Sequence, residues 1–108
     1  MEDSSNPFYL HNGDHPRLIL VSHHLSRSNY NTQSRAMMMA LMTKNKVGFI
    51  DGCISWFASD NLLFNAKSRY NSLVISWLLN SISKEILESI MYMGSAHEIW
   101  TNLRDRFH

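Results

Sequence analysis

The six histidines are the residues of this sequence best suited to metal binding and proton transfer, because imidazole exchanges its proton near neutral pH. His11 and His15 stand four residues apart, the spacing of two metal ligands on one face of a helix. Pro16 follows in the same turn-forming cluster and disfavours a helix, so the spacing loses this meaning. His23 and His24 are adjacent and would point to opposite sides of a strand. We therefore expect surface histidines and no metal site.

Cys53 is the one cysteine of the sequence, which excludes an internal disulfide and a Cys-rich zinc site. A cysteine paired with a histidine can act as a nucleophile, but no recognisable catalytic signature surrounds Cys53. Asp51 and Gly52 are adjacent, so the Thr or Ser expected between them in an aspartic protease is missing. Phosphate-binding glycine motifs and the H-E-x-x-H zinc motif are absent from the sequence. We expect no catalytic activity, and hence no enzyme, and no cofactor.

Two groups of apolar residues could instead contact a partner. Trp56 and Phe57 are adjacent in a predicted loop among small and polar residues, where they are either tucked under the loop or form a contact surface. We take these two as the candidate interaction residues. Met37–Met39, with Met42, form either an adaptable binding surface or the core side of a central helix, and we favour the core.

The composition describes one globular domain. Apolar residues make up 44% of the chain and charged residues 18%, which is too apolar for a disordered protein. Ten Lys and Arg against nine Asp and Glu give a net charge of +1, so no charge excess attracts nucleic acid or an anionic membrane. The closely spaced basic pairs, Lys44 with Lys46 and Arg104 with Arg106, are interpreted as solvated surface.

The ends of the chain predict its boundaries and its location. Residues 1–7 are expected to be a disordered tail and residues 8–108 the domain. No apolar run approaches the roughly 18 residues of a membrane span, and the acidic start lacks the features of a secretory signal. We therefore expect an intracellular, cytoplasmic protein with no membrane partner. An amphipathic helix is still in progress at His108, which favours a domain truncated at its C-terminus.

Hydrophobic periodicity predicts about four helices. The first runs from Thr32, which can cap it, to about Lys44, and it is apolar nearly all round, so it should be central. The second covers residues 65–80, where apolar residues recur at helical spacing. Ser83 can begin a short third helix, and the capping box Ser95–Glu98 begins the last one.

Two short apolar runs, 18–21 and 47–50, are predicted as extended segments that could pair as a small ribbon. Asp51 and Gly52, directly after the second run, favour a turn. The expected fold class is therefore mainly α, with about four helices and one or two short extended segments.

The apolar faces of the second and last helices predict the core. Trp77 and Leu78 lie on the first of these faces, and Ile99, Trp100 and Leu103 lie on the second. Because each helix must bury its apolar face against another element, we expect these five side chains to be buried together.

Two strings of residues are the most specific features of the sequence: K-N-K-V-G-F-I-D-G at 44–52 and E-I-W-T-N-L-R-D-R-F at 98–107. With the segments 6–22, 25–41 and 69–86, they make the chain resemble the N-terminal region of Gag from copia-type LTR retrotransposons of plants. The resemblance covers residues 6–108.

The sequence departs from that family at three positions. Gln33 and Lys67 stand where the family usually has Trp, and Arg27 stands where it usually has Gly. These departures suggest a core that has lost aromatic area.

The resemblance implies a Gag capsid N-terminal-like fold and a structural role without catalysis. The chain would pack against copies of itself or other Gag chains, as a weak homo-oligomer, in a particle shell around element RNA. The family binds nucleic acid through a zinc knuckle, which a single cysteine cannot build, so no direct nucleic-acid site is expected in this chain. The alternative is a host-retained Gag fragment that acts as a protein-binding module.

Overall fold

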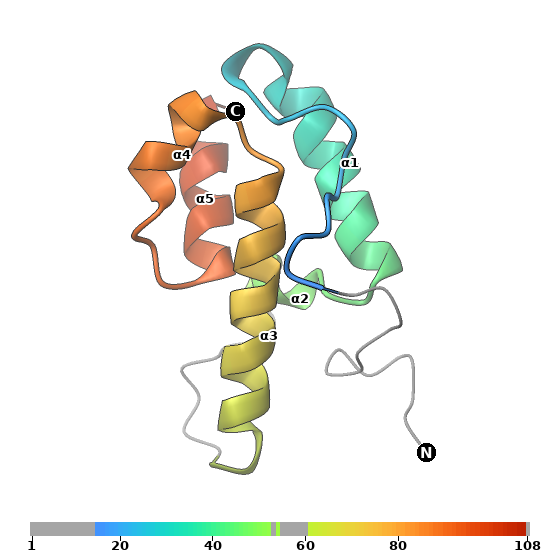
Figure 1. Cartoon of the computed structure of the whole chain (residues 1–108), viewed down its shortest axis with the longest axis vertical. Coiled ribbons are helices and arrows are strands. Elements are labelled where there is room, and N and C mark those ends of the chain that lie inside the picture. The colour runs from blue at the N-terminus through green and yellow to red at the C-terminus, as the bar shows by residue number, and fades with distance from the viewer. Residues whose placement is uncertain (1–14, 53, 55–60, 108) are drawn as a thin grey trace.

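The structure is a computed structural model that describes residues 15–52, 54 and 61–107. Within these residues it is helical and contains no strand, which confirms the mainly α fold. The elements are η1 (Arg27–Asn29), α1 (Tyr30–Thr43), α2 (Gly48–Asp51), α3 (Asn61–Asn80), α4 (Lys84–Ile90) and α5 (Ala96–Phe107). In Figure 1, α3 runs between α1 on one side and α4 with α5 on the other. None of the helices described is long and apolar enough to cross a membrane.

Helix α1 begins three residues earlier than predicted. Asn29 is its N-cap, and Thr32 lies exposed within the first turn. The predicted all-round burial of this helix is wrong, because only Tyr30, Met37 and Leu41 are buried. Met37 and Leu41 are four residues apart, so one narrow stripe of α1 faces the core and the remaining positions face outward.

A Schellman motif ends α1. The backbone N–H of Asn45 donates to the Met42 carbonyl (3.0 Å), and that of Lys46 donates to the Leu41 carbonyl (2.8 Å). Asn45 has a φ of 57°, in the left-handed region that Asn tolerates better than most residues. This motif turns the chain sharply toward α2.

The segment 47–50 belongs to a short helix, so its predicted extended conformation is wrong. The N–H groups of Ile50 and Asp51 both donate to the Val47 carbonyl, at 3.0 and 3.1 Å. Gly52 ends α2 with a φ of 89°, so the chain turns at Gly52, while Asp51, predicted as part of the turn, is the last residue of the helix. A run of four apolar residues fits a strand and a helical turn equally well, and here the left-handed residues before and after it close it into a helix.

The segment 18–21 forms no strand either. With 47–50 helical there is no ribbon partner, and the backbone around 18–21 bonds to α3 instead. The Trp77 indole N–H donates to the His15 carbonyl (2.6 Å), and the Asn80 amide donates to the Pro16 carbonyl (2.7 Å). These side chains hold the segment along the C-terminal part of α3.

Leu25 forms an isolated parallel β-bridge with Ile82, the one strand-like pairing among the described residues. Its N–H donates to the Ser81 carbonyl (2.8 Å), and its carbonyl accepts from the Ser83 N–H (2.9 Å). The buried Ser81 hydroxyl donates to the Trp77 carbonyl and accepts from the Leu20 N–H. Ser81, the residue directly after α3, thus joins the end of that helix to the N-terminal segment.

Helices α4 and α5 begin at the predicted residues. Ser83 is the N-cap of α4, and the Ser95 hydroxyl accepts from the Glu98 N–H at 3.1 Å, which is one half of the predicted capping box. The buried Asn71 of α3 connects to the start of α5: its amide donates to the Gly94 carbonyl (3.2 Å) and accepts from the Ala96 N–H (3.0 Å). This one side chain fixes the turn between α4 and α5 against α3.

Candidate interaction surfaces

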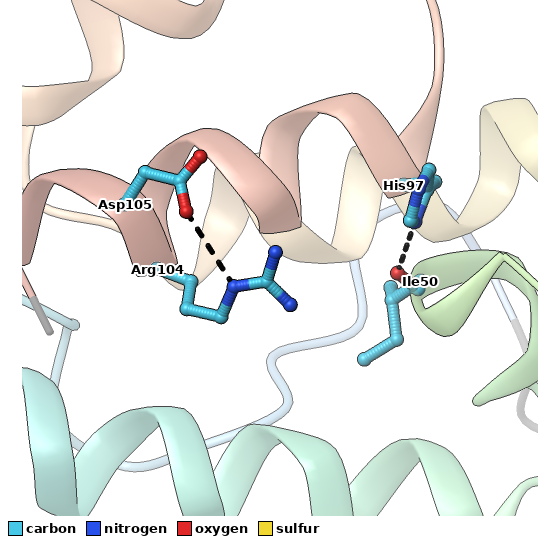
Figure 2. A network of polar contacts seen from close by, with 4 residues as sticks. All are labelled: Ile50, His97, Arg104 and Asp105. Carbon is cyan, nitrogen blue, oxygen red and sulfur yellow. Dashed lines mark hydrogen bonds and ion pairs between the residues drawn. The ribbon is translucent and has the colours of Figure 1, made fainter.

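The segment 44–52, which contains α2, packs against the rest of the fold. Phe49 and Ile50 are buried, and α2 lies against α5. The ring of His97 in α5 makes a hydrogen bond through Nδ1 to the Ile50 carbonyl (2.7 Å), as Figure 2 shows. The His97 ring also lies against Gly52, where an added Cβ would meet its Cε1 at 3.1 Å. A side chain at position 52 would therefore crowd this contact.

Lys46 is the most deeply buried charged residue in the described part of the chain. Its ammonium group lies 5.2 Å from the centroid of the Tyr70 ring, within cation–π range, and 3.5 Å from the Lys44 carbonyl. Lys44 in turn places its ammonium 5.5 Å from the centroid of the Trp77 ring. The interpretation of this basic pair as solvated surface is wrong for Lys46, because its side chain is buried. The ammonium groups of both lysines lie over aromatic rings of α3.

The string 98–107 supplies the inner face of α5. Ile99, Trp100 and Leu103 are buried, and so are Trp77 and Leu78 of α3, all within one hydrophobic cluster. These five residues therefore belong to the core and offer no surface to a partner.

The end of α5 meets the start of α1. The rings of Tyr30 and Phe107 lie 6.0 Å apart, and the guanidinium groups of Arg27 and Arg106 lie 5.5 and 4.9 Å from the Phe107 ring. Arg106 also donates to the Ser89 hydroxyl of α4. Arginine at position 27 therefore contributes a contact between the N-terminal segment and α5.

Burial raises the pKa of the Tyr30 phenol above its ordinary value of 10.0. A hydrogen bond from Ser34 and the charge of Arg104 lower this pKa by smaller amounts, and Asp105 raises it slightly. Figure 2 shows the side chains of Arg104 and Asp105, which are 3.6 Å apart and largely exposed. The net effect keeps Tyr30 neutral within the fold.

The residues considered for chemistry that the structure describes do not gather into a site. No group of three or more His, Cys, Asp or Glu that could hold a metal ion exists among residues 15–52, 54 and 61–107. His15, His23 and His24 are exposed, while His11 and Cys53 lie outside the described residues. The His23 carbonyl accepts a hydrogen bond from the Gln33 amide, which ties this segment to α1.

The candidate interaction residues Trp56 and Phe57 also lie outside the described residues. Their assignment as a contact surface stays a prediction.

One exposed apolar surface lies on the outer side of α1. Met38, Met39 and Met42 are 38, 56 and 59% exposed, so the expectation that they pack in the core is wrong. Met42 follows Met38 and Met39 at the helical spacings of four and three, and Arg35 precedes them by three and four residues on the same stripe. We call Met38, Met39 and Met42 the methionine face. The sequence offered this alternative, an adaptable binding surface, because methionine is flexible and polarisable.

A second exposed apolar surface lies between α4 and α5. Met91 is 53% exposed and Tyr92 is 93% exposed, at the turn that follows α4. We call these two residues the tyrosine turn. The sequence does not predict that the tyrosine turn is exposed, because a single Tyr after a short helix can be either buried or exposed.

The two surfaces belong to elements that lie at opposite edges of the molecule. Figure 1 shows α1 at one edge and the α4–α5 turn at the other, with α3 and α5 between them. Arg35 is the one charged residue of α1, whereas α4 carries two exposed acidic residues, Glu85 and Glu88, against one exposed basic residue, Lys84. The two surfaces therefore differ in charge as well as in position.

Comparison with known proteins supports the resemblance proposed from the sequence. Residues 11–55 match the family described as Gag polypeptide of LTR copia-type. The resemblance is confirmed over that range, which includes α1, the Schellman turn and α2. No curated protein and no solved structure matches the chain.

Proposed function

We propose that this chain, whose residues 11–55 match copia-type Gag, is a non-catalytic structural subunit that associates with copies of itself. The family match carries the proposal, because a Gag polypeptide has a structural, capsid-like role. The finer claim is that the contacts between copies build a particle shell around the RNA of the element.

The surface of the domain supports association. A shell subunit works through repeated contacts, each using a modest apolar patch. The methionine face and the tyrosine turn are two such patches. The net charge of +1 gives little repulsion between copies at neutral pH.

Light scattering after size exclusion, over a concentration range of about a hundredfold, tests the proposal. Such a range shifts a binding equilibrium by roughly 2.7 kcal/mol, enough to reveal weak association. We expect the mean mass to rise with concentration without stopping at a dimer. A strict monomer throughout would overturn self-association by this chain.

The particle claim needs a separate measurement. Electron microscopy of the most concentrated fractions should show curved or closed particles. Amorphous aggregates alone would contradict the shell while leaving self-association intact. If the chain stays monomeric yet forms a stable complex with another Gag chain, it is instead a protein-binding module.

A further inference from the structure

Resting on the self-association proposed above, we propose that the methionine face of one copy binds the tyrosine turn of the next copy. The partner is thus a second copy of this chain, and the contact is head to tail. Each molecule would offer a receiving surface on α1 and an inserting surface between α4 and α5.

The side chains of the two surfaces are complementary in kind. Tyr92 is almost fully exposed, so its ring is available to insert into a partner. Methionine side chains adapt their shape through three rotatable bonds, and their sulfur atoms attract aromatic rings. Met38, Met39 and Met42 form a continuous stripe on which such a ring could rest. Tyrosine is also among the residues that contribute most to binding at interfaces.

The charges next to the two surfaces are opposite in sign. Arg35 lies one turn before Met38 and Met39 and is the one charged residue of its helix. Glu88 precedes Met91 and Tyr92 by three and four residues and is exposed. With the exposed Glu85 it outweighs Lys84, the one basic residue of α4. When Tyr92 of one copy lies on the methionine face of another, Arg35 and Glu88 can approach each other. A pair of methionine faces would instead offer Arg35 no acidic partner from α1, because Arg35 is the one charged residue of that helix.

The tyrosine turn is held in place before any partner binds. The Met91 N–H donates to the Leu87 carbonyl (3.0 Å), and the Met93 N–H donates to the Ile90 carbonyl (3.1 Å). Beyond them, the Gly94 carbonyl accepts from the buried amide of Asn71. A turn fixed at both ends loses less conformational entropy when its tyrosine is captured.

The placement of the surfaces determines what kind of assembly results. Since they lie at opposite edges of one molecule, they cannot meet within a single copy (Figure 1). A contact between different surfaces leaves one of each unused at the ends of every oligomer, so growth continues unless the chain of subunits closes on itself. This is the behaviour expected of a shell subunit.

Mixing two surface variants tests the head-to-tail contact. Met39→Ser with Met42→Ser destroys the methionine face, and Tyr92→Ser destroys the tyrosine turn. Each variant alone should be monomeric at concentrations where the wild type associates. An equimolar mixture should form a one-to-one dimer that does not grow, because it contains one intact surface of each kind. The matched control is Ile19→Ser, at a side chain 62% exposed outside both surfaces, which should associate like the wild type.

Three outcomes separate this inference from the proposed function. A wild type that associates while both variants associate equally well overturns the head-to-tail contact and leaves self-association standing. Two monomeric variants whose mixture stays monomeric also overturn it. A wild type that never associates overturns the proposed function itself. Circular dichroism and urea unfolding of each variant establish that a monomeric result does not arise from misfolding.

A charge exchange tests the register of the contact. Arg35→Glu should weaken association several-fold, and combining it with Glu88→Arg in the same chain should restore it, because the head-to-tail pair is then reversed in sign. A double variant that associates no better than the weaker single variant would overturn the pairing of Arg35 with Glu88.

Discussion

Helices α5 and α1 are both rich in apolar residues, but they use them in opposite ways. In α5 the apolar residues form one stripe, and Ala96, Ile99, Trp100 and Leu103 are all buried along it. In α1 the apolar residues surround the helix, and Met37 is buried while its neighbours Met38 and Met39 are exposed. An amphipathic pattern indicates which face of a helix is buried, whereas an all-round apolar pattern does not.

The difference separates what holds the domain together from what it can offer to a partner. The inner stripe of α5 packs against α3 and contributes to the free energy of folding. The methionine face contributes little to folding, because its side chains remain in contact with water in the monomer. The comparison therefore predicts that substitutions in α5 change stability and that substitutions on the outer side of α1 change association.

The largest effect is expected at Trp100. Trp100→Ala removes a large buried ring from the core and should lower the free energy of unfolding by about 3–5 kcal/mol. Urea unfolding followed by circular dichroism measures this loss. A cost below about 1 kcal/mol would mean that α5 does not pack through this face.

The matched pair Met37→Ala and Met39→Ala tests α1 within one helix. Met37→Ala should cost about 2–5 kcal/mol because it leaves a cavity, whereas Met39→Ala should change stability by less than about 0.5 kcal/mol. The same unfolding measurement applies to both variants. Equal effects would show that the two sides of α1 do not differ as described.

Gly52→Ala should destabilise the contact between α2 and α5. The left-handed backbone at position 52 costs an L-residue about 1–2 kcal/mol, and the added Cβ meets the His97 ring. Gly94→Ala is the control, because no atom lies within 4 Å of the added Cβ there. We expect thermal unfolding to shift clearly for the first variant and little for the second; the reverse order would contradict the geometry of the α2 end.

The smallest effect on stability is expected at Tyr30 of α1, whose ring lies near Phe107 of α5. Burial raises the pKa of its phenol, so the stability that this group contributes is complete below pH 10.0 and is lost as the pH rises through the higher pKa of the folded state. Tyr30→Phe removes the ionisable group. The decline in stability above pH 10.0 should therefore be shallower in the variant than in the wild type, as measured by urea midpoints across this range. Parallel declines would show that Tyr30 does not titrate differently on folding.

The sequence predicts the helical elements well because their signals are local. Helical spacing indicated α3 and α5, and the caps Ser83 and Ser95 lie where the structure has them. The segments 18–21 and 47–50 were predicted wrongly because runs of four apolar residues carry no decisive period. The conformation of 18–21 depends on a distant group, the Ser81 hydroxyl that bonds to Leu20. That of 47–50 depends on the left-handed residues Asn45 and Gly52 on either side of it.

The candidate surfaces are harder to predict than the helices. The methionine face depends on which side of α1 meets the core, which is a property of the whole fold. Asn71 is equally hard to predict, since an amide within a helix does not reveal that it will bond to a turn 23 residues further along the chain. Trp56 and Phe57 differ from these cases. The sequence singles them out as candidate interaction residues, but they lie outside the described residues, so this assignment stays a prediction.

The bonds between the N-terminal segment and α3 have a consequence for the order of folding. Trp77 and Asn80 hold the carbonyls of His15 and Pro16 across 62 and 64 residues of chain. On a ribosome, the early segment leaves the exit tunnel long before its partners exist, so it cannot reach its final position while the first helices form. Contacts of such long sequence separation close late and slow the search for the native state. The docking of residues 15–25 should therefore be among the last folding events, after α3 has formed.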